Sequence, residues 1–133
     1  MYGDLAPWWP LISPPEDYVA EGDMVATLFA GSGTPVRTVL ELGSGGGHVA
    51  SHLAGRFEMT LVDLSPAMLA ESTQLNPASA HVVGDMRTVR LGRLFDGVLV
   101  HDALDYLVTD DEVAALATTI ETHLRPGGVA LLV

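Results

Sequence analysis

Residues 41–48 have the sequence ELGSGGGH, directly after the apolar run TVL at positions 38–40. Glycine occupies four of the five positions from Gly43 to Gly47, where an apolar strand pattern gives way to a helical one. Glycine allows a backbone turn with positive φ and the close approach of a ligand. The stretch therefore predicts a strand, a loop and a helix, with the loop either against a ligand or forming only a tight turn.

Short apolar strands alternate with helical segments on both sides of this loop. Strands are expected at residues 37–42, 57–63, 80–83, 94–100 and 129–133, and helices at 14–30, 48–54, 66–75 and 110–124. The apolar stripes expected to be buried are Val19, Met24, Val25, Leu28 and Phe29 in the first helix, and Val113, Leu116, Ala117, Ile120 and Leu124 in the last. The alternation predicts an open α/β sheet of parallel strands, which binds ligands at the carboxyl ends of its strands.

The composition narrows the class of protein. The 133 residues are 48% hydrophobic and 17% charged, which predicts one folded domain over 1–133, with 1–35 as an N-terminal lid or helix segment and 36–133 as the core. The net charge of −11, with no lysine, makes nucleic acid and anionic membranes poor partners. The N-terminus does not resemble a secretory signal, and a soluble cytoplasmic protein is expected. The five histidines form no recognisable metal motif.

Phosphate binding by the glycine loop is only weakly indicated. A nucleotide triphosphatase loop requires a lysine, which this chain lacks. The dinucleotide fingerprint G-x-G-x-x-G fits better, although His48 stands at its third glycine position. Asp63 follows at the spacing of the acid that binds a ribose in such folds, so an NAD-linked oxidoreductase stays open. The cluster Arg87, Arg90 and Arg93 favours a solvated loop face over an anion site.

Two further acids favour a different ligand. Glu41 stands directly before the loop, where a carboxylate disfavours a pyrophosphate and suits a ligand that carries an amino group and a sulfonium. Asp85 follows the third strand in the sequence Gly84-Asp85-Met86, where its carboxylate is able to accept a hydrogen bond from an adenine amine. The acids together favour a ligand with a positive end and an adenosine.

Five segments in order resemble the class I S-adenosylmethionine-dependent methyltransferases: VLELGSGGG, LVDLS, GDM, FDGVLV and LRPGGVALLV. The stretch GDMRTVRLGRLFD is similar to small-molecule methyltransferases that include sugar N-methyltransferases. The resemblance implies a Rossmann-like parallel sheet with strand order 3-2-1-4-5 and helices on both faces. It also implies transfer of a methyl group from S-adenosylmethionine to an O or N atom of a small molecule, which leaves S-adenosylhomocysteine.

The resemblance assigns a cofactor role to particular residues. The loop backbone would pass under the methionine part, Asp63 would hold the ribose hydroxyls, and Asp85 would face the adenine. The full set is Glu41, Gly43, Ser44, Gly45, Asp63, Leu64, Asp85, Met86 and His101. His101 and Asp102 are also the candidates for a general base, although a structural role is open for both. Tyr2, Trp8 and Trp9 form a lid over the site or pack on the body of the domain.

The chain departs from this family after the fifth strand. The family's sheet continues with an antiparallel pair of strands, whereas this sequence stops at Val129–Val133, leaving an unpaired apolar edge. Three explanations are open: a shortened chain, a second copy or another protein that completes the sheet, or a non-catalytic module that binds the cofactor without turnover.

Overall fold

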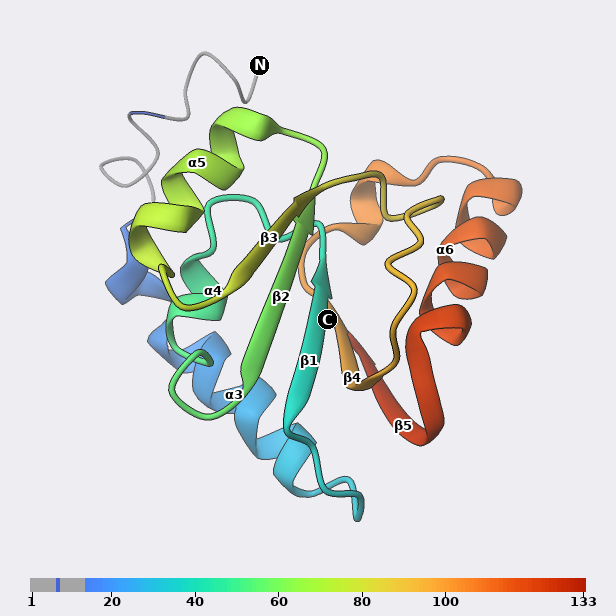
Figure 1. Cartoon of the computed structure of the whole chain (residues 1–133), viewed down its shortest axis with the longest axis horizontal. Coiled ribbons are helices and arrows are strands. Elements are labelled where there is room, and N and C mark those ends of the chain that lie inside the picture. The colour runs from blue at the N-terminus through green and yellow to red at the C-terminus, as the bar shows by residue number, and fades with distance from the viewer. Residues whose placement is uncertain (1–6, 8–13) are drawn as a thin grey trace.

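A five-stranded parallel sheet forms the centre of the chain in a computed structural model that describes residue 7 and residues 14–133 (Figure 1). Its strands are β1 (Thr38–Leu42), β2 (Glu58–Asp63), β3 (Ala80–Val83), β4 (Phe95–Val100) and β5 (Leu124–Leu132). They lie in the order β3-β2-β1-β4-β5, and every neighbouring pair is parallel. The predicted fold class and strand order are therefore confirmed.

Two helices precede β1, and the others lie in the connections from β1 to β2, from β2 to β3 and from β4 to β5. The helices are η2 (Pro15–Tyr18), α3 (Val19–Ala30), α4 (His48–Ser51), α5 (Pro66–Leu75), η3 (Leu104–Tyr106) and α6 (Asp110–His123). The Ser65 hydroxyl accepts a hydrogen bond from the Met68 N–H and so caps α5, and Thr109 caps α6 in the same way through the Glu112 N–H. A side-chain cap satisfies one of the N–H groups left unpaired at a helix start, which fixes where each helix begins.

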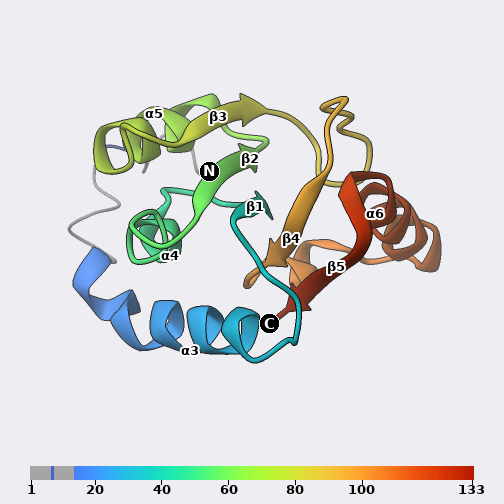
Figure 2. The same ribbon diagram turned by 60° about the horizontal axis from the view of Figure 1, so that its bottom comes forward.

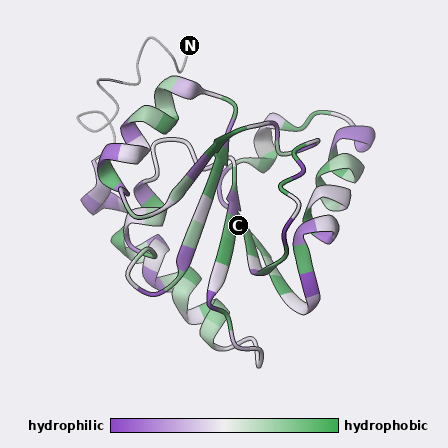
Figure 3. Cartoon of the chain, in the orientation of Figure 1, coloured by the Kyte–Doolittle hydropathy of each residue, from purple (hydrophilic) through white to green (hydrophobic). Residues whose placement is uncertain are grey.

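Both faces of the sheet are covered. Figure 2 shows α3, α4 and α5 along one face and α6 along the other. On the first face Val25 and Phe29 of α3 pack with Val39, Leu61 and Leu99 of the sheet. A second apolar cluster, which includes Leu40, Val98, Leu116 and Ile120, lies between the sheet and α6. Figure 3 shows the matching pattern, with hydrophobic stretches on the central strands and both colours along α6.

The predicted buried stripes of the first and last helices were partly wrong. In α3 the buried residues are Gly22, Val25, Ala26 and Phe29, while Val19, Met24 and Leu28 are exposed. Gly22 faces inward because a Cβ atom there would approach the His52 Cβ to 2.6 Å. In α6 the buried residues are Leu116, Thr119, Ile120 and His123, while Val113 and Ala117 are exposed. Leu124 lies outside the helix, in β5.

The predicted start of the last strand also differs from the structure. The strand begins at Leu124, opposite Phe95, and the ladder resumes with Val129 opposite Gly97. Residues 125–128 therefore form a bulge beside Asp96, whose carboxylate accepts a hydrogen bond of 2.5 Å from Arg125 Nε. A bulge inserts extra residues into one strand without ending it. Residues 125–128 (RPGG) therefore lie within β5 as a bulge, and the strand begins before them.

The predicted helix over residues 48–54 is shorter in the structure, where α4 ends at Ser51. The following turn is held by bonds from His52 N to Val49 O and from Leu53 N to Ala50 O. Within the described part of the chain, no helix combines the length and the apolar composition needed to cross a lipid bilayer.

Candidate cofactor site

A pocket of about 450 Å³ lies at the carboxyl ends of the central strands. The residues predicted for the cofactor all line it: Glu41, Gly43, Ser44, Gly45, Asp63, Leu64, Asp85, Met86 and His101. Parallel strands end at the same edge of a sheet, which brings residues 41–45, 63–64, 84–87 and 101–103 together. The structure therefore places the predicted set around one cavity.

The glycine loop uses four of its N–H groups for hydrogen bonds within the protein. The Gly43 and Ser44 N–H groups donate to the Val62 carbonyl at 2.8 and 3.0 Å, and the Gly45 N–H donates to Asp63 Oδ1 at 2.9 Å. The Gly47 N–H donates to the Ser44 carbonyl at 3.1 Å. A phosphate-binding loop instead presents several free N–H groups to its anion. This loop offers a close-fitting backbone surface and not a phosphate cradle.

Positive φ angles explain three of the loop glycines. Gly43, Gly45 and Gly47 have φ of 73°, 57° and 77°. Two of them also lie against the protein itself. A Cβ on Gly43 would come within 2.7 Å of the Ala103 Cβ, and one on Gly47 would come within 2.2 Å of Ser72 Oγ. Packing therefore explains Gly43 without the ligand contact that the sequence suggested, whereas a Cβ on Gly45 would meet only Met68 Cε, at 3.6 Å.

Glu41 is a buried carboxyl group on the floor of the pocket. Its residue is 2% exposed, and Oε1 has no hydrogen-bond partner among the described residues. The Ser44 hydroxyl is equally unpaired among these residues. Burial, and then the nearby charge of Asp63, raise the pKa of Glu41 to about 8. Buried polar groups are rarely left without partners, so this pair of oxygens suits a polar ligand.

Asp63 links two segments of the pocket wall. Its Oδ1 accepts the hydrogen bond from Gly45, and its Oδ2 accepts one of 3.0 Å from the Ser65 N–H. Each carboxylate oxygen is able to accept two hydrogen bonds, so both keep capacity for a ligand. Leu64 is 64% exposed beside it and presents an apolar surface at the pocket.

Asp85 is held by an arginine that the sequence interpretation assigned to a solvated face. Arg87 donates to the Asp85 carboxylate through its backbone N–H, Nε and Nη2, at 2.6 to 3.1 Å. These bonds lower the pKa of Asp85. The other arginines of the cluster are also engaged: Arg90 donates to Thr119 Oγ1 at 2.9 Å, and Arg93 lies 4.3 Å from the Phe95 ring centre. Arg90 and Arg93 are exposed, as a solvated loop face predicts, whereas Arg87 is half-buried and lines the pocket.

His101 and Asp102 lie at the pocket but do not form a hydrogen-bonded pair. His101 Nδ1 is 3.7 Å from Asp102 Oδ2, which is too long for a hydrogen bond. The His101 side chain is 9% exposed, whereas that of Asp102 is 81% exposed. Asp102 also has a φ of 52°, a conformation that is costly for a residue other than glycine.

Several residues that line the pocket were not among the predicted site residues. They are Tyr18, Gly46, His48, Val49, Ser65, Met68, Gly84, Arg87, Ala103, Tyr106, Leu107 and Glu112. The rings of Tyr18 and His48 lie edge to face with 5.2 Å between their centres, and burial lowers the pKa of His48. The only usable signals were the arginine two residues after Asp85 and the capping box that places Glu112 in the first turn of α6. The predicted lid residues Tyr2, Trp8 and Trp9 lie outside the described residues.

No group of three or more metal-ligating side chains occurs in the described part of the chain. The pocket is lined by the loop backbone, by carboxyl groups, by polar side chains such as His101 and Arg87, and by apolar side chains such as Leu64 and Met86. A glycine loop after β1, an acid at the end of β2 and another after β3 define a Rossmann-like domain for an adenosine-containing ligand.

The chain belongs to the methyltransferase family, because the model of the family described as "Methyltransferase domain" matches residues 39–128. One relative, the dTDP-3-amino-3,4,6-trideoxy-alpha-D-glucopyranose N,N-dimethyltransferase of Streptomyces venezuelae, is 32% identical over 119 residues, which are 88% of this chain and 50% of the relative. The structure of CalS10 with bound S-adenosylmethionine, an amino pentose methyltransferase from Micromonospora echinaspora, is 33% identical with a TM-score of 0.82.

The CalS10 match covers 86% of this chain and 50% of that one. The sugar N-methyltransferase KedS8 from Streptoalloteichus sp. is 29% identical with a TM-score of 0.82, over 86% of this chain and 47% of that one. The chain thus spans about half the length of the relatives that it matches.

Proposed function

We propose that this chain binds S-adenosylmethionine and takes part in methyl transfer to a nitrogen or oxygen atom of a small molecule. The observation that carries the proposal is the buried Glu41 carboxyl, whose Oε1 has no partner among the described residues, in the same pocket as Asp63 and Asp85. A ligand with an ammonium group, a ribose and an adenine offers partners to these three acids. The N–H groups of Gly43, Ser44, Gly45 and Gly47 are already bonded within the protein, which disfavours the pyrophosphate of NAD.

Different residues of the pocket would bind different parts of the cofactor. Glu41 would bind its amino-acid end, the loop at Gly43–Gly45 would pass under the methionine part, and Asp63 would bind the ribose hydroxyls. The adenine would lie between Leu64, Asp85 and Met86, and the His101 carbonyl would meet the amino group. When bound, the cofactor supplies a methyl group on a positively charged sulfur, and S-adenosylhomocysteine is the product.

The contribution of the protein to such a displacement is mainly orientation and the exclusion of water. An amine acceptor must also lose a proton, and His101 is our first candidate to take it, which is supported by its mostly buried side chain at the pocket. Asp102, which is mostly exposed, is the second candidate for this role. The names of the S. venezuelae relative, CalS10 and KedS8 favour the amino group of a sugar as the acceptor.

The test of this function is methyl transfer from labelled S-adenosylmethionine to a panel of amino sugars, their nucleotide conjugates and hydroxylated small molecules. We expect transfer to an amino sugar by the wild type, and a loss of at least about tenfold in His101→Gln. Cofactor binding without transfer to any acceptor would instead support a non-catalytic cofactor-binding or assembly module. Transfer that His101→Gln leaves unchanged would remove His101 from the reaction.

We also propose that a second copy of the chain pairs with the edge of β5 in the cytoplasm. Residues 129–133 carry no charge or proline, and β5 pairs only with β4 among the described residues. Leu132 is 47% exposed and Val133 is 38% exposed at this edge. A strand edge of this kind associates readily, and two identical edges match around a twofold axis. Sedimentation is expected to show a dimer, and a monomer at high concentration would contradict this.

A further inference from the structure

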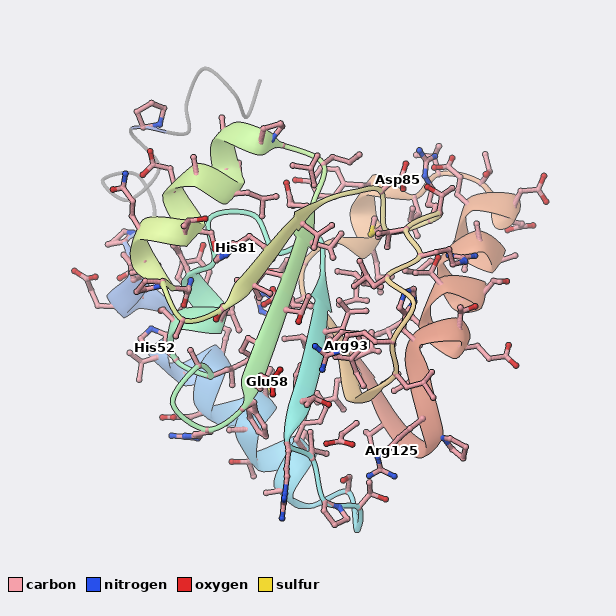
Figure 4. All side chains as sticks on the ribbon, in the orientation of Figure 1. His52, Glu58, His81, Asp85, Arg93 and Arg125 are labelled. Carbon is pink, nitrogen blue, oxygen red and sulfur yellow. The ribbon has the colours of Figure 1, made fainter. Side chains whose placement is uncertain are left out.

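Arg87 joins two segments that border the pocket. Its Nη1 donates to Glu112 Oε2 at 2.9 Å, while its Nε and Nη2 hold Asp85. Glu112 belongs to the first turn of α6, where its N–H donates to Thr109 Oγ1 at 3.1 Å. The guanidinium therefore connects the loop after β3 with the start of α6. Figure 4 shows Asp85 on that loop, near the upper end of α6 in this view.

The three arginines of the cluster Arg87, Arg90 and Arg93 differ in their position relative to the pocket. Arg87 lines the pocket, whereas Arg90 bonds to Val89 O and Thr119 Oγ1 and does not line it. Arg93 lies 3.6 Å from Glu58 at the start of β2, well below Asp85 in Figure 4. Arg87 is thus the arginine of the three whose charge reaches the pocket.

The bonds from Arg87 leave Asp85 with acceptor capacity. A carboxylate has about four acceptor sites. Arg87 gives Asp85 three N–H donors, namely the backbone N–H, Nε–H and Nη2–H, and the Nε–H is shared between Oδ1 and Oδ2 at 3.0 and 3.1 Å. These three hydrogens fill three of the sites. One site remains for a donor in the pocket, and the planar guanidinium fixes the plane in which that site lies. A free aspartate on a loop would rotate and would become protonated more easily.

We infer that Arg87 is the positioning residue for adenine recognition: it orients Asp85 toward the exocyclic amine, and Glu112 anchors it from α6. This inference rests on the proposed function, since it concerns how the same pocket recognises the adenine of the cofactor. An adenine donates an N–H to Asp85, whereas a hypoxanthine presents a carbonyl oxygen at that position. Two acceptors that face each other repel, so the fixed carboxylate selects adenine.

The test compares the binding of S-adenosylhomocysteine with that of its inosine analogue, by calorimetry on the 133-residue chain. We expect the wild type to prefer the adenosine ligand by at least about tenfold. In Arg87→Gln, this preference falls to less than about threefold, mainly through weaker binding of the adenosine ligand. Arg90→Gln is the matched control on the same loop and keeps the preference.

An unchanged preference in folded Arg87→Gln, or an equal loss of affinity for both ligands, would overturn the inference. If Arg87→Gln does not fold, Arg87→Lys provides the test, because lysine keeps the charge but not the planar fork. The preference of Arg87→Lys is expected to lie between that of the wild type and no preference, and a wild-type preference would overturn the inference. Failure of the wild type to bind either ligand would instead contradict the proposed function.

Discussion

Asp63 Oδ1 accepts a hydrogen bond of 2.9 Å from the Gly45 N–H, so the acid that ends β2 holds the glycine loop that follows β1. The other oxygen, Oδ2, accepts from the Ser65 N–H at 3.0 Å, directly before α5. One side chain therefore fixes the relative positions of two pocket walls. The proposed ribose contact and the shape of the loop depend on the same carboxylate.

The first prediction concerns Asp63→Asn. An asparagine has one acceptor oxygen, so its amide nitrogen would face either the Gly45 or the Ser65 N–H group. We expect the free energy of unfolding to fall by about 1–3 kcal/mol in urea denaturation, and the affinity for S-adenosylhomocysteine to fall at least about tenfold. Glu58→Gln, at the exposed start of β2, is the control and should stay within about 0.5 kcal/mol. Equal behaviour of the two variants would contradict the role of Asp63.

The second prediction concerns Gly47→Ala. A Cβ there would come within 2.2 Å of Ser72 Oγ and 2.4 Å of Asn76 Nδ2, at a φ of 77°. Gly92→Ala is a matched control, because Gly92 has a φ of 71° and nothing lies within 4 Å of its added Cβ. The control should lose about 1–2 kcal/mol from its backbone angle alone, and Gly47→Ala at least about 2 kcal/mol more. Thermal melts that agree for both variants would refute the packing explanation.

The third prediction concerns the pH dependence that Glu41 introduces. Burial raises the pKa of Glu41 from 4.5 to about 8 in the folded chain. The folded state thus binds a proton that the unfolded state releases between pH 4.5 and 8, and stability falls as the pH rises through this window. Glu41→Gln cannot titrate, so its stability relative to the wild type should rise by more than about 2 kcal/mol from pH 5 to 8. Urea midpoints whose difference is constant with pH would rule this out.

The fourth prediction concerns Asp96, which lies at the other end of the sheet. Although burial opposes its ionisation, hydrogen bonds from the Arg37 and Thr38 N–H groups and from Arg125 lower the pKa of Asp96 to about 2. This contribution is complete above the unfolded pKa near 4 and is lost as the pH falls toward 2. Asp96→Asn should cost about 2 kcal/mol at pH 6, and less at pH 2.5. A cost that does not shrink in acid would show that its ionisation is not responsible.

The parallel sheet and the grouping of the acids at one edge were predictable from the sequence. Strand periodicity gives the alternation, and parallel strands bring Glu41, Asp63 and Asp85 to the same edge. The Arg87–Glu112 contact was not predictable, because it joins residues 25 positions apart through the packing of α6. Nothing in the local pattern of either residue encodes the position of that helix.

The buried helix faces and the bulge in β5 were mispredicted for a related reason. Hydropathy favours Met24 and Leu28 as buried residues, but the close contact with His52 selects Gly22. Likewise His123 is buried in α6 because its Nε2 accepts the Leu91 N–H at 3.0 Å. Whether a glycine or a histidine in a helix is buried depends on its contacts with distant parts of the chain. Hydrophobic periodicity does not reveal these contacts.

Calorimetric titration of the 133-residue chain with S-adenosylmethionine, S-adenosylhomocysteine and NAD tests the central claim most directly. We expect both sulfur ligands to bind with micromolar affinity, and Glu41→Gln to weaken both, since each carries the same amino group. NAD is expected not to bind, because four of the loop N–H groups already donate hydrogen bonds within the protein. Binding of NAD, or no binding of either sulfur ligand at high micromolar concentration, would contradict the account.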